Sequence, residues 1–191
     1  MKNMKLKELI KIESGVNTVR LKDNEYELYT LEDVNYDLGH GEDYKHEVSY
    51  RKNIVARGDI VTNTVGNMTS IVHTKNSGKL LNQIFMKLSI NNKEILDPWY
   101  LCYLLNESEY IKYQEASIMG GSVIKKLTKV NLENLEVNLP TIDEQRKIGE
   151  AYKETLRKYT LITEKAELEK NLYLQMLGEK DLNNRSVVEN G

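Results

Sequence analysis

The chain has 191 residues and a mass of 22.1 kDa, which is enough for one sizeable hydrophobic core and one appended element. Hydrophobic residues make up 40% and charged residues 29%, as in ordinary globular proteins, and the formal net charge is −2. No run approaches 18 apolar residues, and Met1–Lys5 lacks the apolar core of a signal peptide, so we expect a cytoplasmic protein with no membrane contact. A lone cysteine, Cys102, excludes an internal disulfide.

The small net charge hides a segregation of charges along the chain. Residues 1–43 carry 6 basic and 10 acidic side chains, whereas residues 44–87 carry 7 basic and 2 acidic ones. Residues 117–130 add three lysines and no acid. If the two basic segments fold onto one face, they form a surface that attracts phosphate groups; the alternative is scattered lysines in water.

The N-terminal third predicts short elements with polar connections. Residues 4–13 form an amphipathic segment whose expected buried positions are Leu6, Leu9, Ile10 and Ile12. Residues 25–30 predict a strand. Residues 37–43 predict a polar loop, in which Gly39–His40–Gly41 is read as flexible rather than as a phosphate cradle.

The centre of the chain, residues 53–90, predicts a strand-rich core. Ile54–Arg57 and Ile60–Val65 alternate around a Gly58–Asp59 turn, which favours a hairpin. Gly66–Asn67 is a second turn that leads into residues 69–73, and a third turn precedes the apolar run of residues 84–90.

Helical spacing replaces strand spacing after residue 96. Asp97 is an expected N-cap and Pro98 occupies the favoured first position of a helix that continues to about Ala116. Residues 120–122 (Gly–Gly–Ser) break it and are read as a turn. A short helix over residues 129–134 and a strand over residues 135–139 follow.

Pro140 stops this strand, and Thr141 with Glu144 makes a capping box for a helix over residues 142–177, about 54 Å long. We expect Gly178 to end it and residues 179–191 to be a disordered tail. Heptad-like spacing predicts a seam that must be buried on another surface. Its residues are Ile148, Tyr152, Leu156, Tyr159, Ile162, Tyr173 and Met176.

The motifs of the common enzymes are missing. The sequence has no Walker loop, no Rossmann glycine pattern and no Cys/His spacing typical of a metal site. It also lacks an Asn-Pro-Pro-Tyr-type motif and the glycine-rich cofactor loop of an adenine methyltransferase. We therefore expect a protein without catalytic residues, metal or cofactor, so that any methyl or cleavage chemistry comes from another chain.

A set of short motifs, in this order, resembles the specificity subunits of type I restriction–modification systems. The motifs are Lys5–Gly15, Gly58–Val61, Leu81–Leu88, Asp97–Asn106, Gly121–Leu127 and Leu127–Ile148. The resemblance implies an α+β fold: one mixed target recognition domain over residues 1–140, with a strand-rich core and short helices. One long coiled-coil helix follows over residues 141–178, used for spacing and dimerisation.

The resemblance also implies the partners. Family members usually have two recognition domains and two long helices, whereas this sequence shows one of each, so it resembles a half-length form. We expect it to bind double-stranded DNA and methyltransferase subunits, with a restriction subunit left open, and to form a homodimer through the helix. The alternative is a non-catalytic adaptor that binds proteins through the same scaffold; a stand-alone enzyme is disfavoured.

Candidate DNA contacts lie in the polar loops between the motifs. Amide, guanidinium and ring groups can read base edges, whereas lysines and arginines position phosphates. The base-edge candidates are Tyr44, His46, Arg57, Asn63 and Asn67, and the phosphate candidates are Arg51, Lys52, Lys75, Lys79, Lys125 and Lys126.

Overall fold

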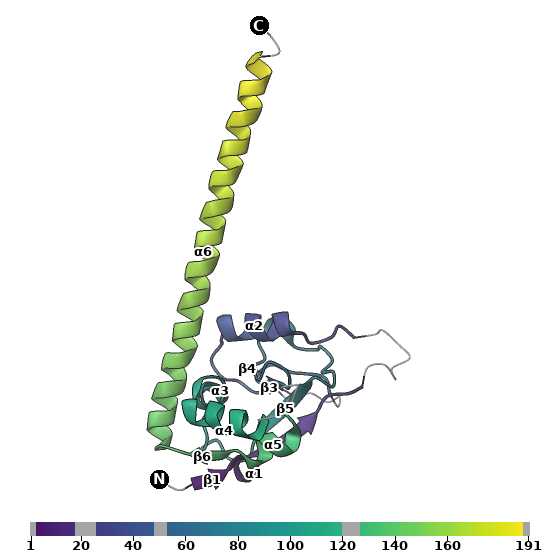
Figure 1. Cartoon of the computed structure of the whole chain (residues 1–191), viewed down its shortest axis with the longest axis vertical. Helices are drawn as coiled ribbons and strands as arrows, with labels where there is room; N and C mark the ends of the chain where they lie inside the picture. The colour runs from purple at the N-terminus through teal and green to yellow at the C-terminus, as the bar shows by residue number, and fades with distance from the viewer. Residues whose placement is uncertain (1–2, 18–25, 48–52, 120–126, 189–191) are drawn as a thin grey trace.

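The computed structural model describes residues 3–17, 26–47, 53–119 and 127–188. It shows a mixed α+β domain with one long helix projecting from it, as expected (Figure 1). The strands are β1 (Asn3–Lys5), β2 (Ile10–Ser14), β3 (Ile60–Asn63), β4 (Thr69–Ile71), β5 (Phe85–Ile90) and β6 (Glu136–Asn138). The helices are α1 (Leu6–Leu9), α2 (Leu31–Gly39), α3 (Pro98–Glu107), α4 (Glu109–Met119), α5 (Lys129–Asn134) and α6 (Ile142–Val188), with a 3-10 turn, η2 (Thr74–Asn76).

Four strands form an antiparallel sheet in the order β2-β5-β3-β4. The Gly66–Asn67 turn joins β3 to β4, so the second predicted turn is confirmed. A separate two-stranded sheet pairs β1 with β6, which brings the start of the chain beside the strand that precedes α6. The first strand of the chain therefore lies beside the strand that leads into the long helix.

The core lies between the sheet and helices α2 and α3. Phe85, Leu81 and Leu101 are fully buried there, together with Tyr29. The N-terminal expectation is confirmed for burial, since Leu6, Leu9, Ile10 and Ile12 are all buried, although the segment divides into β1, α1 and β2.

Several predicted elements differ in the structure. Residues 54–57 form no hairpin with β3; Ile54 instead makes a single bridge with Leu80, which also bridges Leu28, so residues 26–30 are not a strand. The predicted loop over residues 37–43 is wrong at its start, because α2 continues to Gly39 and buries Asp37. The helix expected up to Ala116 is interrupted at Ser108, where α4 takes over from α3.

The C-terminal helix starts as predicted and ends later. The Thr141 backbone N–H and hydroxyl both donate to the Glu144 carboxylate, and the Glu144 N–H donates to the Thr141 hydroxyl, so the capping box is confirmed. The expected stop at Gly178 is wrong, because α6 runs through it to Val188, over 47 residues. Its length is about 70 Å, and one exposed glycine lowers helix propensity too little to end a helix of this length.

Candidate functional site

Hydrogen bonds of the Gln145 side chain connect the first turn of α6 to the domain. Its side chain is buried; the amide nitrogen donates to the carbonyl oxygens of Ile95 and Pro140, each at 3.0 Å, and the amide oxygen accepts from the Asp97 N–H at 3.1 Å. Asp97 in turn caps α3 through Tyr100 N at 2.9 Å. One glutamine thus links the start of α6 by hydrogen bonds to the residues that precede α3 and to Pro140.

Close approach of α6 to α3 requires a glycine one turn later. A Cβ atom at Gly149 would lie 2.7 Å from both the Asp97 carboxylate oxygen and the Tyr100 nitrogen. Ile148, Tyr152 and Leu156 pack against the domain core from the same stretch of helix. Three of the seven predicted seam residues are therefore partly buried within the chain.

Asn106 connects this stretch of α6 to the sheet. Its side chain accepts from the Thr69 N–H and donates to the Thr69 carbonyl, both at 2.8 Å, as a neighbouring strand would at the β4 edge. The same amide nitrogen donates to the Tyr152 hydroxyl at 3.0 Å. The orientation of the long helix is thereby coupled to an edge strand of the recognition domain.

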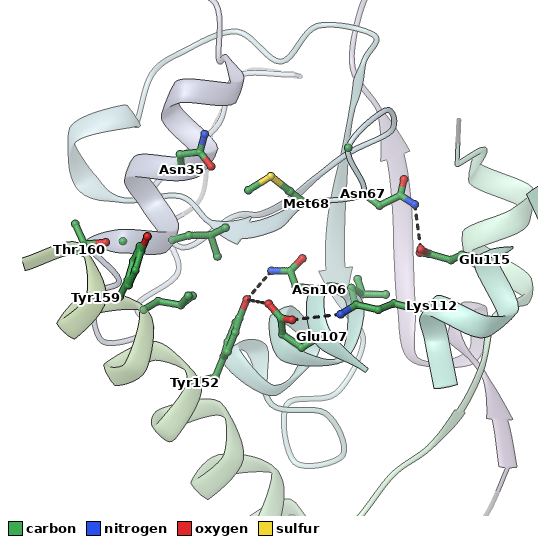
Figure 2. A pocket seen from close by; sticks show the side chains of 15 residues that line it. Asn35, Asn67, Met68, Asn106, Glu107, Lys112, Glu115, Tyr152, Tyr159 and Thr160 are labelled. Carbon is green, nitrogen blue, oxygen red and sulfur yellow. Dashed lines mark hydrogen bonds and ion pairs between the residues drawn. The ribbon is translucent and has the colours of Figure 1, made fainter. Parts of the chain in front are cut away.

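A cavity of about 580 Å³ opens where α6 leaves the domain, between α2, the β3–β4 turn, α3, α4 and α6 (Figure 2). Leucines, a methionine and tyrosines give it apolar walls. Its charged side chains are Glu107, Lys112 and Glu115, and burial raises the pKa of Glu115. Two carboxylates against one ammonium disfavour a phosphate ligand, although the predicted base reader Asn67 is part of the wall.

Beyond Glu164, which contacts His40 at the end of α2, α6 projects from the domain (Figure 1). Tyr159, which lines the cavity, and Ile162, Tyr173 and Met176 further along the helix are between 48% and 70% exposed. These four seam residues are available to another chain, unlike Ile148, Tyr152 and Leu156. Exposed apolar side chains repeated along one helix face are typical of an assembly surface.

An aromatic and basic cluster lies on α2 and η2. The Tyr36 ring stacks on His40 with centroids 3.9 Å apart, the His73 ring meets it edge-on, and the Lys75 ammonium lies 3.9 Å above it. Lys75 is exposed, as a phosphate contact requires. His40 also reaches Glu164 of α6 at 3.1 Å, so the cluster lies beside the helix.

Glu42 organises the neighbouring basic groups. Its carboxylate forms an ion pair with Arg57, whose Nε lies 2.9 Å away without a hydrogen bond, and lies 3.1 Å from the His73 Nε2. Burial lowers the pKa of His73, although Glu42 opposes this effect. The Arg57 side chain is three-quarters buried and is ion-paired with Glu42, so it is less available to contact a base.

The Gly58–Asp59 motif is structural. Gly58 has φ = +81°, and a Cβ there would lie 2.4 Å from the Lys45 carbonyl oxygen. The buried Asp59 carboxylate accepts from Ala56 N at 2.8 Å, pairs with Lys87 at 2.5 Å and contacts the His46 ring at 3.1 Å. His46 remains partly exposed, so its ring can face a ligand only from one side.

Two asparagines proposed as base readers hold the β3–β4 turn. Asn63 is fully buried, and its side-chain oxygen accepts from the N–H groups of Val65 and Gly66, each at 2.7 Å. Full burial and these two hydrogen bonds weigh against a base contact by Asn63, whose amide nitrogen has no hydrogen-bond partner among the described residues; the base contact itself stays a prediction. Asn67 has φ = +52° and donates to Glu115 at 3.0 Å.

The remaining candidates divide by burial. Lys79 pairs with Glu27 at 2.7 Å and Asp33 at 2.9 Å; burial would lower its pKa, but these hydrogen bonds outweigh it and raise the pKa. Tyr44 is half-buried, with the Lys93 ammonium 4.7 Å from its ring, and burial raises its pKa to about 12. Arg51, Lys52, Lys125 and Lys126 lie outside the described residues.

Sequence reasoning missed Tyr36, Gln145 and Asn106. Tyr36 and its neighbours were hidden by the loop assigned after residue 36, although Thr30 with Asp33 forms a capping box that signals α2. Gln145 belongs to the Leu127–Ile148 motif, but no pattern indicates its three partners. Over the described residues, no three His, Cys, Asp or Glu side chains gather as a metal group, and no helix is long and apolar enough to span a membrane.

One recognition domain joined to one long helix defines the class of this protein, and comparison with known proteins gives its family. The sequence model described as the type I restriction modification DNA specificity domain matches residues 1–172. The chain therefore belongs to the type I restriction–modification specificity family. It is also 36% identical over 63 residues to the putative type I restriction enzyme MjaX specificity subunit of Methanocaldococcus jannaschii, across 33% of this chain and 14% of that protein.

Solved structures share the fold. The HsdS subunit of Thermoanaerobacter tengcongensis superposes with a TM-score of 0.50 at 19% identity, covering 86% of this chain and 39% of that one. A chain from a study of complex assembly and conformational transition in the type I restriction–modification system gives a TM-score of 0.55 at 19% identity, covering 92% and 43%. This chain thus spans about two fifths of the length of these structural relatives.

Proposed function

We propose that this protein is a DNA-specificity subunit of a type I restriction–modification system that binds one half of a split DNA site. It has no catalytic role of its own and acts in the cytoplasm with methyltransferase subunits, with or without a restriction subunit. Two copies associate through α6 and present two recognition domains to one DNA duplex.

The observation that carries this proposal is the division of α6 into two parts. Its first turns are fastened to the domain by Gln145 and Asn106–Tyr152, whereas Tyr159, Ile162, Tyr173 and Met176 extend beyond it with their apolar groups exposed. A rigid arm with an unfilled apolar row suits a subunit that positions a DNA-reading domain within an assembly.

Support for the DNA contact comes from the Tyr36–Lys75 cluster, where an exposed ammonium and aromatic rings lie together. Lysine contacts to phosphate are independent of sequence and weaken with salt, whereas base reading needs further contacts from the loops. We propose Lys75 as a phosphate contact within the described residues, and keep Arg51, Lys52, Lys125 and Lys126 as candidates.

A protein-binding adaptor is the second candidate. Three cations of the basic segment are paired internally: Arg57 with Glu42, Lys79 with Asp33, and Lys87 with Asp59. Such pairing reduces the positive charge that the domain offers to DNA. The adaptor would bind proteins through α6 and would show no salt-dependent affinity for duplexes.

Two experiments separate these functions. Methylation mapping of a genome with and without this gene would show, for a specificity subunit, the loss of methylation at one split sequence, which also identifies the target. Binding of the purified chain to duplexes that carry this sequence should weaken linearly in log salt. Unchanged methylation together with no DNA binding at low salt would refute the proposal and favour the adaptor.

A further inference from the structure

His40, at the C-terminal end of α2, contacts α6 where the long helix leaves the domain (Figure 1). Its Nε2 lies 3.1 Å from the Glu164 carboxylate, and its Nδ1 lies 3.0 Å from the Tyr36 carbonyl oxygen. Among the residues that the structure describes, no other hydrogen bond or ion pair joins α6 to the domain beyond Lys153, which pairs with Asp43. His40 therefore holds the helix at its last polar contact with the domain.

The two partners of His40 define the protonation state of its ring. A carboxylate and a backbone carbonyl can each only accept a hydrogen bond. A neutral imidazole carries one N–H, so it can donate to Tyr36 or to Glu164 and must turn a lone pair toward the other oxygen. An imidazolium carries two N–H groups and donates to both. The position of the ring between two acceptors is therefore that of a protonated histidine.

The other contacts of the ring also favour a cation. His40 follows the last turn of α2, where backbone carbonyl groups without helical partners give the helix end a partial negative charge. Its ring stacks on Tyr36, with centroids 3.9 Å apart and planes inclined by 10°, and the face of an aromatic ring attracts a positive charge. Both contacts are stronger for the imidazolium than for the neutral ring.

The charged groups that the neighbouring elements bring to this place do not replace that cation. His73 accepts the Lys75 N–H with its Nδ1, so its Nε2 carries the hydrogen that faces Glu42, which is the arrangement of a neutral ring. Burial lowers the pKa of His73, in agreement with this state. Arg57 is ion-paired with Glu42, and the Lys75 ammonium lies over the Tyr36 ring. Of the two histidines, only His40 is placed as a cation.

A close packing contact lies beside the hydrogen bonds of His40. A Cβ atom at Gly39 would lie 2.3 Å from the Thr160 hydroxyl, so the end of α2 touches α6 one turn before Glu164. We infer that protonated His40 positions α6 against α2, and that loss of its proton frees the distal helix to change direction. The inference rests on the proposed function only for its consequence, which is a pH-dependent placement of the recognition domain within the assembly.

The length of α6 magnifies a small change of angle at its base. Asn171 lies about 19 residues beyond Tyr152, or about 28 Å along the helix. A tilt of about 10° around Tyr152 therefore moves Asn171 by about 5 Å. A displacement of this size is measurable as a change in the distance between two spin labels, one on the domain and one on the distal helix.

Electron–electron double resonance on the full chain tests the inference. The labels are attached to Ser77→Cys, on the domain, and Asn171→Cys, on α6; both positions are exposed, whereas Cys102 is buried. Excess unlabelled chain restricts the measurement to distances within one molecule. Because histidine changes its charge between about pH 5 and 8, the distance distribution should broaden or shift by about 3–5 Å between these values. Identical distributions would overturn the inference.

Two substitutions assign the effect to this contact. In Glu164→Gln the amide accepts from a charged ring and donates to a neutral one, so the distribution should stay narrow at both pH values. His40→Phe keeps a ring to stack on Tyr36 but has no nitrogen, and its distribution should be broad at both. Glu167→Gln changes an exposed carboxylate that pairs along the helix with Lys170, so it should respond to pH as the wild type does. A pH response that persists in Glu164→Gln and His40→Phe would overturn the assignment to His40.

Binding of the same chains to a duplex of mixed sequence at low salt separates this inference from the proposed function. A pH-dependent distance without any duplex binding would support the role of His40 and count against the DNA-specificity function. Salt-dependent duplex binding with a distance that ignores pH would leave the specificity function standing and refute the role of His40.

Discussion

The amide nitrogen of Asn106 donates to the hydroxyl of Tyr152 at 3.0 Å, while the rest of the Asn106 amide pairs with both backbone groups of Thr69. A single side chain on α3 thus hydrogen-bonds the free backbone N–H and carbonyl at the edge of β4 and also contacts the long helix. Because a strand edge and a helix share this partner, a change in the domain is transmitted to the direction of α6.

Replacement of Asn106 should therefore cost stability beyond the loss of one hydrogen bond. Asn106→Ala leaves the Thr69 N–H and carbonyl without their partner, and we expect a loss of about 2–3 kcal/mol in the free energy of unfolding. Tyr152→Phe removes only the hydroxyl and should cost about 1 kcal/mol. Urea denaturation measures both. Asn171→Ala, on the exposed part of α6, is the control, and an equal effect of Asn171→Ala and Asn106→Ala would contradict the assignment.

Gln145 should be more sensitive to substitution than its neighbour Arg146. Gln145→Ala breaks three buried hydrogen bonds and separates the starts of α3 and α6, for an expected loss of about 2–4 kcal/mol. The neighbouring Arg146 is half-exposed and pairs with Glu94 and Asp143, so Arg146→Ala should cost under about 1 kcal/mol. Thermal or urea unfolding measures both variants. Similar losses in the free energy of unfolding would mean that the Gln145 hydrogen bonds do not hold α6 on the domain.

Asp37 gives the domain a pH dependence of stability. Burial raises its pKa from 3.8 to about 6, although Tyr29 donates to it at 2.6 Å and Asn76 at 2.7 Å. The folded protein holds the proton while the unfolded chain releases it, so stability falls as pH rises from about 4 to about 6. The loss attributable to this carboxyl is on the order of 3 kcal/mol.

The test compares unfolding free energies of wild type and Asp37→Asn across pH 4–7. The variant should lack this decline, whereas the exposed control Asp143→Asn should keep it. If the curves of wild type and Asp37→Asn run parallel over this interval, the carboxyl is not the source of the dependence.

The paired and unpaired lysines should differ in DNA binding. Lys75→Ala removes an exposed ammonium from the Tyr36 cluster and should reduce the slope of log affinity against log salt by about 1, for all duplexes alike. Lys79→Ala removes a lysine committed to Glu27 and Asp33 and should leave the slope unchanged. Equal slopes for wild type and Lys75→Ala would remove Lys75 from the interface.

The parts of the fold that sequence reasoning predicted depend on residues close together in the chain. The Asp97 cap, the Thr141–Glu144 capping box and the Gly66–Asn67 turn are each satisfied within four residues, and all are present. The predicted hairpin over residues 54–65 failed because Ile54 pairs with Leu80, a partner that only the assembled sheet supplies.

The candidate DNA residues show the same limit. Asn63 and Lys79 are polar residue types typical of interfaces, yet one is buried in the β3–β4 turn and the other pairs with two acids distant in sequence. Residue type indicates which chemistry a side chain can perform. Burial and competing partners decide whether it is available to DNA, and both arise from long-range packing.

The sequence by itself determined the family, the junction at Pro140–Glu144 and the existence of a long apolar helix, since these depend on local order and spacing. Only the tertiary structure decided that Ile148, Tyr152 and Leu156 serve the domain while Tyr159, Ile162, Tyr173 and Met176 remain exposed. A heptad pattern states that one helix face needs a partner. Which partner covers each turn depends on where the domain ends in space, and that follows from the Gln145 and Asn106 contacts.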